Sequence, residues 1–300
     1  MEPRLDKSEV LARCRAFAAM AFWPPTRNTN PELWLANFNK DEQEHALGLL
    51  NAFAYFNRDI TDTLLLRSIR LLADDITTGV AGYSAKKHHW IGFLNAAKFT
   101  HLRSEENSGD DTKSGILFMR KVRQIIQPFD EQLVKAEVLL QSLVDGDVFP
   151  VIVVDDFAGT GETIISGLRR QYQLTDGSTT SFLEQAKNGT SIYFCPVICT
   201  EKARTNIEAL GIPTLKVSCA HFLSERMSVL HPDSEMVPAY LRKEMPTMVT
   251  EASRRSGSDD PFFGYSDLGL AIGFEHATPD ATLPIFYWEG PNWNNLVSRR

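Results

Sequence analysis

The sequence is short of cysteine and of long apolar runs, and both shortages exclude whole classes of protein. Four cysteines in 300 residues are too few for a disulfide-built secreted scaffold, and their spacing lacks the paired Cys-x-x-Cys pattern of zinc sites. No apolar run approaches the roughly 18–20 residues that a membrane span needs. The first residues hold no apolar signal core. We therefore expect a chain of the reducing cytoplasm with no membrane association.

Positive charge is also in short supply. The chain carries 31 lysines and arginines against 38 aspartates and glutamates, which gives a formal net charge of −7. Non-specific coating of nucleic acid depends on clustered lysine and arginine, so the balance disfavours that function for the chain as a whole. It leaves open a local basic groove. With 43% hydrophobic residues, the composition is that of an ordinary globular protein of one or two domains.

Apolar residues recur at helical spacing in the first eighty or so residues. The pattern i, i+4, i+7, i+8 runs over 10–21, and similar stripes cover 47–56 and 65–76. Such stripes are typical of helices that face a core. We therefore predict a helical N-terminal region over residues 1–85.

The rest of the chain changes to alternating strands and helices. A strand is expected within 88–102, followed by a polar loop over 104–115 and two helices. Further strands are predicted at 148–154, 191–199, 214–219 and 268–274, with helices at 161–174 and 201–210 and an exposed loop at 251–260. This alternation indicates βαβ units. We therefore predict an α/β fold, with a parallel sheet in a core that spans 86–300.

One segment, residues 151–163, combines a buried strand with polar chemistry. Its apolar run ends in Asp155 and Asp156, a loop of small residues follows, and a helix then begins. A helix start offers unpaired N–H groups and the positive end of the helix dipole, so it suits a phosphate. Gly159 and Gly161 let the backbone approach that phosphate closely. Ionised acids only accept hydrogen bonds, and beside a phosphate their natural partners are the vicinal hydroxyls of a sugar.

Other phosphate-binding motifs do not match this spacing. A P-loop needs a lysine directly after its second glycine, and no lysine follows Gly161. A dinucleotide fingerprint needs a third glycine where this chain has Ile164. The remaining alternative is structural: a strand end with solvated acids and an ordinary glycine turn.

The same segment resembles the phosphoribosyl-pyrophosphate (PRPP) signature of type I phosphoribosyltransferases. It has four apolar residues, two acids, two small or apolar residues and then Gly-Thr-Gly-x-Thr. The resemblance implies the parallel sheet of those enzymes, and it implies that Asp155 and Asp156 hold the ribose 2′- and 3′-hydroxyls. The residues that would wrap the 5′-phosphate are Ala158, Gly159, Thr160, Gly161, Glu162 and Thr163.

Four further segments are similar to one bacterial family, namely 112–115, 118–124, 261–265 and 277–288. This is the phosphoribosyltransferase-like family of conflict, or antiviral, systems, which is often encoded with helix-turn-helix partners and in some retron loci. Its usual pattern has an acid where this chain has Lys113. The resemblance implies a toxin or effector whose partner is a regulatory protein or a complex of reverse transcriptase and nucleic acid. It leaves oligomer formation open.

Type I enzymes also need a loop that receives pyrophosphate. By its order along the chain, the loop after the first strand is the candidate, and it contains Glu105 and Glu106. These acids would repel pyrophosphate unless Mg²⁺ lay between them, with carboxylate, water and phosphate oxygens as its ligands. We therefore expect Mg²⁺ as the cofactor. The alternative is that both acids are solvated loop residues.

Lys113, Ser114, Arg120 and Arg123 complete the candidate second loop and its following helix. The two arginines are three residues apart, so they share a helix face. Together with Lys113 they could contact phosphate, since arginine suits bidentate phosphate contacts. A solvated helix face explains them equally well.

Three functional hypotheses follow. The first is an enzyme in which Mg²⁺ and cationic groups stabilise departing pyrophosphate while a nitrogen nucleophile attacks the anomeric carbon. No side chain stands out as a general acid or base, so no catalytic residue is assigned. The second is a non-catalytic module that senses a phosphorylated ribonucleotide and switches a partner. The third is a structural component of a nucleoprotein complex, with Arg120 and Arg123 at the interface.

Overall fold

The chain forms two compact units, each with its own packing. A computed structural model describes residues 4–25, 28–102 and 113–299. Unit 1 combines Met1–Thr61 with Leu223–Arg300, and unit 2 is Asp62–Phe222. This grouping by packing differs from the expected division into 1–85 and 86–300, which stays a prediction. Among the described residues, no helix is both long and apolar enough to cross a lipid bilayer.

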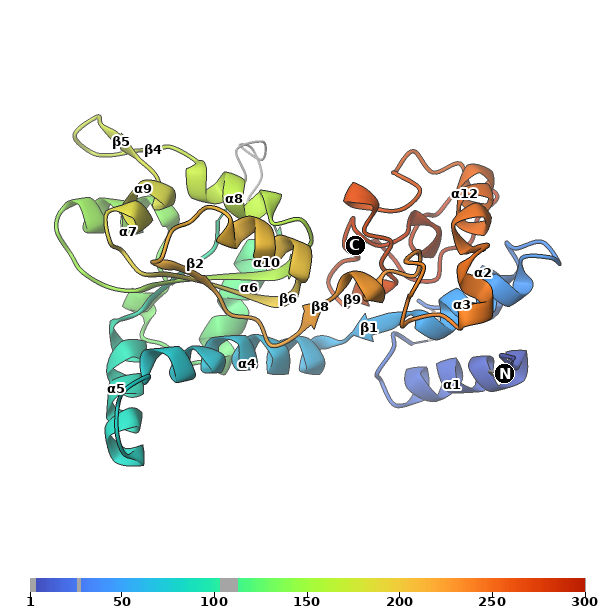
Figure 1. Ribbon diagram of the computed structural model, residues 1–300, viewed down its shortest axis with the longest axis horizontal. Coiled ribbons are helices and arrows are strands. Elements are labelled where there is room, and N and C mark those ends of the chain that lie inside the picture. Colours follow the sequence, from blue (N-terminus) through green and yellow to red (C-terminus); the bar gives the residue numbers. More distant parts are fainter. Residues whose placement is uncertain (1–3, 26–27, 103–112, 300) are drawn as a thin grey trace. The chain divides into compact units, whose positions relative to one another are not determined.

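Unit 2 is built on a parallel sheet (Figure 1). Its strands are β2 (Lys98–Thr100), β3 (Val151–Ala158), β6 (Ile192–Thr200) and β7 (Leu215–Val217), in that spatial order, and β8 (Phe222–Leu223) pairs with β6. All nine residues of β6 are buried, as are the first four of β3. Continuous apolar runs are typical of parallel strands covered on both faces. The predicted α/β class with a parallel sheet is therefore confirmed.

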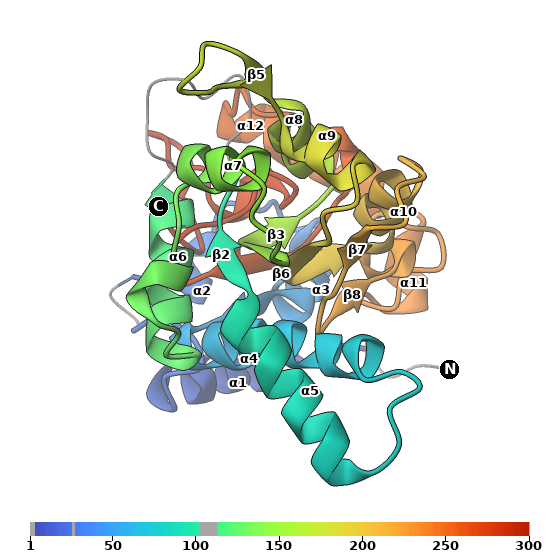
Figure 2. The same ribbon diagram turned by 90° about the vertical axis from the view of Figure 1, so that its left-hand side faces the viewer.

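Helices cover both faces of this sheet, as Figure 2 shows. The helices of unit 2 are α4 (Arg58–Ile76, which begins just before the unit boundary), α5 (Tyr83–Ala96), α6 (Lys113–Ile125), α7 (Ala136–Val144), α8 (Glu162–Arg169), α9 (Phe182–Lys187) and α10 (Glu201–Glu208), together with the short η1 (Asp130–Gln132) and the hairpin β4 (Tyr172–Gln173) and β5 (Thr179–Thr180). Buried residues of α7, α8, α9 and α10 pack with Val151 and Val153 in one core cluster. Both views place α4 on the opposite face.

A proline interrupts the hydrogen-bonding pattern in the centre of the sheet. Pro196 lies in β6 opposite Asp155 of β3, and it has no N–H to give to a neighbouring strand. Its carbonyl accepts a hydrogen bond from Ser68 Oγ of α4 at 2.8 Å, and the same Oγ accepts one from the Ala220 N–H at 2.9 Å. Ser68 of α4 therefore bridges the Pro196 carbonyl and the Ala220 N–H.

The secondary structure predicted for two segments was wrong. Residues 83–96, expected to lie partly in a strand, form helix α5, and β2 keeps only Lys98–Thr100. Residues 251–260 were expected to be an exposed loop, but most of them belong to α12 (Met245–Ser256). Their small polar side chains are buried, since Ser253 is 0% exposed, so polar composition misled the prediction. The strand expected at 268–274 shortens to β9 (Ile272–Phe274).

Unit 1 joins the two ends of the chain in one core. Its elements are α1 (Lys7–Ala19), α2 (Pro31–Leu35), α3 (Gln43–Ala52), α11 (Ala239–Arg242) and α12, the short η2 (Glu225–Met227), η3 (Tyr265–Asp267) and η4 (Pro284–Phe286), and strand β1 (Ala54–Phe56), which pairs in parallel with β9. Trp34 is fully buried, stacks on Phe286 at 5.2 Å between ring centroids, and donates from Nε1 to the Ile285 carbonyl at 2.7 Å. Apolar burial between distant segments therefore holds this unit together.

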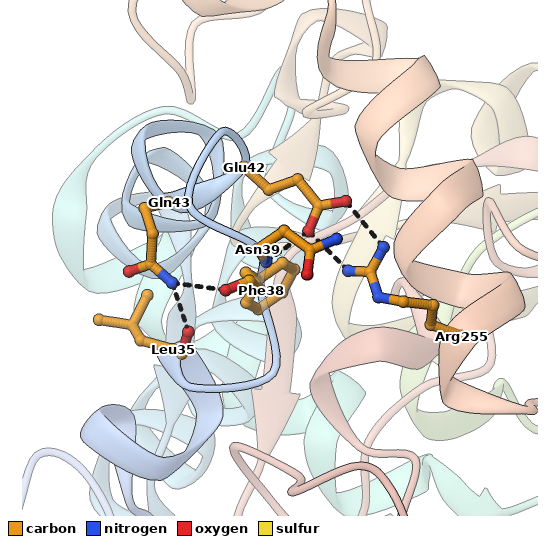
Figure 3. Close-up of polar contacts among 6 residues, drawn as sticks. All are labelled: Leu35, Phe38, Asn39, Glu42, Gln43 and Arg255. Carbon is orange, nitrogen blue, oxygen red and sulfur yellow. Dashed lines mark hydrogen bonds and ion pairs between the residues drawn. The ribbon is translucent and has the colours of Figure 1, made fainter.

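An ion pair between buried Glu42 and the more exposed Arg255 fixes the segment between α2 and α3 to α12 (Figure 3). The Arg255 guanidinium donates to both carboxylate oxygens of Glu42, at 2.8 and 2.6 Å, and the Asn39 N–H donates to the same carboxylate at 2.8 Å. Gln43 Nε2 donates to the carbonyls of Leu35 and Phe38 at 2.9 and 2.8 Å. The Leu35 carbonyl at the end of α2 and the Phe38 carbonyl in the segment after it are thereby satisfied.

Replacing the buried partner of this pair should cost far more than replacing an exposed one. Glu42→Gln leaves the Arg255 guanidinium without its anion, so we expect the free energy of unfolding to fall by about 1–3 kcal/mol. Glu32→Gln removes the exposed pair with Arg15 and should cost about 0–1 kcal/mol. Urea unfolding of the two full-length variants measures the difference. Equal losses would show that the Glu42 contact is not the stabilising one.

Candidate functional site

The acidic pair lies inside β3 rather than after it. β3 extends to Ala158, and Asp155 pairs with Pro196 in the register with β6. Each carboxylate accepts a hydrogen bond from the next backbone N–H: Asp156 N–H donates to Asp155 Oδ1 at 2.9 Å, and Phe157 N–H donates to Asp156 Oδ1 at 2.8 Å. These bonds hold both side chains against the strand, so the acids are ordered by backbone and are not free surface groups.

Asp155 is held in an environment that disfavours its charge. Burial, and then the neighbouring carboxylate of Asp156, raises the pKa of Asp155 well above its ordinary value. Removing a carboxylate from water and placing a second one beside it both penalise the ionised form. Perturbed carboxyl groups of this kind cluster at functional sites. The strand end therefore carries one carboxyl that a ligand donor or a cation would stabilise.

The loop after β3 presents backbone N–H groups. Within the part of the chain that the structure describes, the N–H groups of Gly159, Thr160 and Gly161 have no hydrogen-bond acceptor. The Glu162 N–H donates to Thr160 Oγ1 at 3.3 Å, and α8 begins at Glu162. The first N–H groups of a helix have no partner inside it. A row of donors at a helix N-terminus is the arrangement that binds phosphate in proteins.

Helix α10 holds this loop in place. Thr200, the N-cap of α10, donates from Oγ1 to the Gly159 carbonyl at 2.5 Å and accepts from the Ala203 N–H at 3.0 Å. Asn206 Nδ2 donates to the Thr160 carbonyl at 2.9 Å. Because both loop carbonyls are bound on the α10 side, the loop's shape is set before any ligand arrives.

The glycine at the start of α8 allows the close approach. Gly161 has φ of +79°, and a Cβ built on it would lie 3.1 Å from the Ala203 carbonyl oxygen and 3.3 Å from Ile207 Cγ1. Only glycine adopts this backbone region without strain and also fits this space. The motif's second glycine is thus explained by its contact with α10.

The sequence prediction missed Thr200 and Asn206. Thr200 carries a readable signal, because a threonine directly after a strand and before a helix is a typical N-cap. Asn206 carries none, since its contact with Thr160 joins residues 46 positions apart. Only the pairing of β3 with β6 makes that contact.

The other predicted site residues are not joined to this loop by the contacts described. Glu105 and Glu106 lie outside the described residues, and Lys113 and Ser114 lie in the first turn of α6. Arg120 and Arg123 are exposed on α6, and Arg123 forms an ion pair with Asp130 at 3.2 Å. Their predicted contact with phosphate stays a prediction.

Two other kinds of chemistry find no support in the described residues. No group of three histidine, cysteine, aspartate or glutamate residues gathers there in a way that could hold a metal ion by protein ligands alone. All four cysteines are free and buried. Burial raises the pKa of Cys14 and of Cys219 to about 11, so neither thiol is a thiolate nucleophile at neutral pH.

A parallel sheet whose strand β3 carries an acidic pair and a donor-lined loop is the arrangement expected from the resemblance to type I phosphoribosyltransferases. A protein-family model described as PRTase-CE matches residues 31–299 of this chain. The chain therefore belongs to the PRTase-CE family, a phosphoribosyltransferase-type family. This confirms the predicted family resemblance and the predicted type of fold. Searches of curated proteins and of solved structures gave no significant match.

Gly161→Ala tests the contact between the loop and α10. Gly177 offers a matched control, because its φ is +84° but no atom lies within 4 Å of a Cβ built there. We expect Gly177→Ala to lower the free energy of unfolding by about 1–2 kcal/mol through backbone strain alone. Gly161→Ala should lose roughly 1 kcal/mol more, because α10 must shift. Urea unfolding measures both, and equal losses would contradict a tight contact.

The raised pKa of Asp155 predicts how stability changes with pH. A carboxyl with a raised pKa holds its proton more tightly in the folded state, so stability falls as pH rises from the unfolded value of about 3.9 through the folded value. Asp155→Asn removes this loss and should raise the Tm at pH 8 above that of wild type.

Thermal unfolding between pH 4 and pH 8 checks this result. The gain over wild type should shrink toward pH 4, where the carboxyl is protonated in the folded state and about half protonated in the unfolded state. Asp147→Asn, at an exposed position before β3, matches the change in net charge and should show no such trend. A wild-type Tm at pH 8 equal to that of the Asp155 variant would refute the prediction.

Proposed function

We propose that this chain binds PRPP, or a closely related ribose phosphate, at the β3–α8 loop and transfers its phosphoribosyl group to a nitrogen nucleophile. One observation carries the proposal: unpaired N–H groups of a loop fixed by α10 stand next to two ordered carboxylates. The donors suit a phosphate and the acceptors suit sugar hydroxyls, and one ribose 5-phosphate carries both groups.

Each part of the ligand has a partner in this arrangement. The 5′-phosphate receives hydrogen bonds from the backbone between Ala158 and Thr163, with the hydroxyls of Thr160 and Thr163 as further donors. Asp155 and Asp156 accept hydrogen bonds from the ribose 2′- and 3′-hydroxyls. Neutral backbone donors and the dipole of α8 supply the attraction, so an acidic chain can hold a phosphate without lysine or arginine at this point.

Mg²⁺ is the proposed cofactor, and the residues present fit a metal that arrives with its substrate. Mg²⁺ usually binds through one or two carboxylates together with water and substrate phosphate oxygens. Asp155 and Asp156 provide carboxylate oxygens of this kind, and Glu105 and Glu106 are further candidates. When bound with pyrophosphate, Mg²⁺ would neutralise the charge of the leaving group.

The chain's own groups act by position and charge. The C1′–O bond to pyrophosphate breaks, positive charge develops on the ribose ring, and a bond from C1′ to the nitrogen of the acceptor forms. The loop holds the 5′-phosphate and the acids hold the hydroxyls, so the anomeric carbon is kept in one place during this exchange. The nearby carboxylates favour the positive charge that develops on the sugar.

We also propose the biological setting that the family resemblance implies. The chain would act as an effector of a bacterial antiviral system in the reducing cytoplasm, controlled by a regulatory protein or by a complex of reverse transcriptase and nucleic acid. Its four free, buried cysteines agree with a reducing compartment. The acceptor of the phosphoribosyl group and the oligomeric state are not part of the proposal.

Asp156→Asn should weaken PRPP binding about tenfold or more, because a carboxylate that accepts hydrogen bonds from ribose hydroxyls becomes an amide. Calorimetric titration of wild type with PRPP and Mg²⁺ gives the reference affinity. Asp147→Asn is the control and should bind as wild type does. Binding unchanged in Asp156→Asn would refute the ribose site.

Turnover is tested separately from binding. Isotope-labelled PRPP, Mg²⁺ and a panel of nucleobases should release labelled pyrophosphate with wild type but not with Asp156→Asn. Binding that persists without any pyrophosphate release would instead support a sensor that recognises the ligand and switches a partner.

A further inference from the structure

Helix α5 is anchored firmly at one end only. The Gln132 side chain, which is 3% exposed, donates from Nε2 to the carbonyls of Leu94 and Ala97 at 2.7 and 2.9 Å. Phe93 packs edge-on against Tyr193 of β6 at 5.4 Å between ring centroids. These contacts satisfy the carbonyls at the C-terminal end of the helix and attach that end to unit 2.

The other half of α5 projects away from the sheet of unit 2, as Figures 1 and 2 show. Residues 81–89 are all exposed, Tyr83 is 83% exposed, and no residue of the helix counts as buried among those described. Most helical stability in proteins comes from packing of one face, and this half of α5 lacks such packing within the described residues. It therefore offers an uncovered surface to a partner.

One face of the projecting half combines aromatic and basic side chains. Tyr83, Lys86, Lys87 and Trp90 follow the spacing i, i+3, i+4, i+7, which places them on the same side of the helix. Neither lysine has an ion-pair partner within the described part of the chain. Trp90 is fixed by stacking on Phe93, with ring centroids 5.5 Å apart and planes 17° from parallel.

The surrounding sequence is basic in an otherwise acidic chain. No aspartate or glutamate occurs between Asp75 and Glu105, although the whole chain has 38 in 300 residues. The same stretch holds four lysines and arginines, namely Lys86, Lys87, Lys98 and Arg103. Asp75 itself is paired with Lys216 at 2.9 Å. The face on α5 itself carries Lys86 and Lys87 and no acid, so it is locally basic although the net charge of the chain is −7.

We propose that this face of α5 binds single-stranded nucleic acid. Lys86 and Lys87 contact backbone phosphates, and exposed Tyr83 stacks on a base, with Trp90 as the second aromatic of the face. Positive charge that follows the backbone, combined with aromatic rings that take bases, is how single strands are held without sequence preference. An acidic protein partner would explain the lysines but would leave the aromatic pair around them without a role. This surface is separate from the proposed ribose-phosphate site and does not depend on it.

Fluorescence anisotropy with labelled 20-nucleotide RNA and DNA single strands of mixed sequence tests the proposal on the full chain. Wild type should bind with an affinity that falls as salt rises. The double variant Lys86→Ala/Lys87→Ala should bind more weakly, and its slope of log K against log salt should be shallower by about 1.4, or about 0.7 for each phosphate contact. Tyr83→Ala should bind roughly five- to a hundredfold more weakly, with the salt slope unchanged.

A double variant of equal charge change is the control. Lys135→Ala/Lys187→Ala removes two exposed lysines of unit 2 that lie outside α5, and it should bind as wild type does. Far-UV circular dichroism and Tm confirm that the variants fold, since the exposed side chains support no buried contact. Equal weakening in both double variants, or no binding of either strand at low salt, would overturn the proposal. So would a dimer that Tyr83→Ala abolishes in light scattering without any nucleic-acid binding, because the face would then serve a second copy of the chain.

Discussion

The parallel register between β3 and β6 is the constraint on which the candidate site depends. It sets Ala158 opposite Cys199, so the loops that leave the two strands begin side by side. Thr200 can therefore cap α10 and bind the Gly159 carbonyl with the same hydroxyl. A slip of one residue would turn the alternating side chains of β3 to the opposite faces and would separate both loop carbonyls from α10. The register of the sheet therefore sets the geometry of the site.

Two features of the loop and its acids are unfavourable without a partner. Asp155 is half-buried beside a second carboxylate, and the loop N–H groups lack partners among the described residues. Features of this kind persist when the surrounding structure determines them, and they gather where a ligand later satisfies them. The site is thus maintained by packing elsewhere in unit 2, which includes the fully buried strand β6.

The elements that could be predicted from the sequence are those whose apolar pattern indicates a buried strand or helix face. Continuous apolar runs located β3 and β6 to within a few residues, and local motif spacing located the loop and the start of α8. Helix α5 was not predicted, because apolar periodicity indicates a buried face and no residue of α5 is buried. The C-terminal part of helix α12 was not predicted, because serines form part of its buried face. Thr200 and Asn206 could not be assigned to the site, since their loop contacts arise only from pairing between strands whose partner residues lie 41 positions apart in sequence.

The order of segments in unit 1 has a consequence for how the protein is made. Trp34 finds its partners, Ile285 and Phe286, some 250 residues further along the chain. During synthesis the ribosome completes all of unit 2 before those partners exist. Unit 2 can therefore fold while the apolar side chains of residues 1–61 still lack the C-terminal residues that complete their core. Nascent chains in this state expose surfaces that aggregate, so residues 1–61 lack part of their core until synthesis of the chain is almost complete.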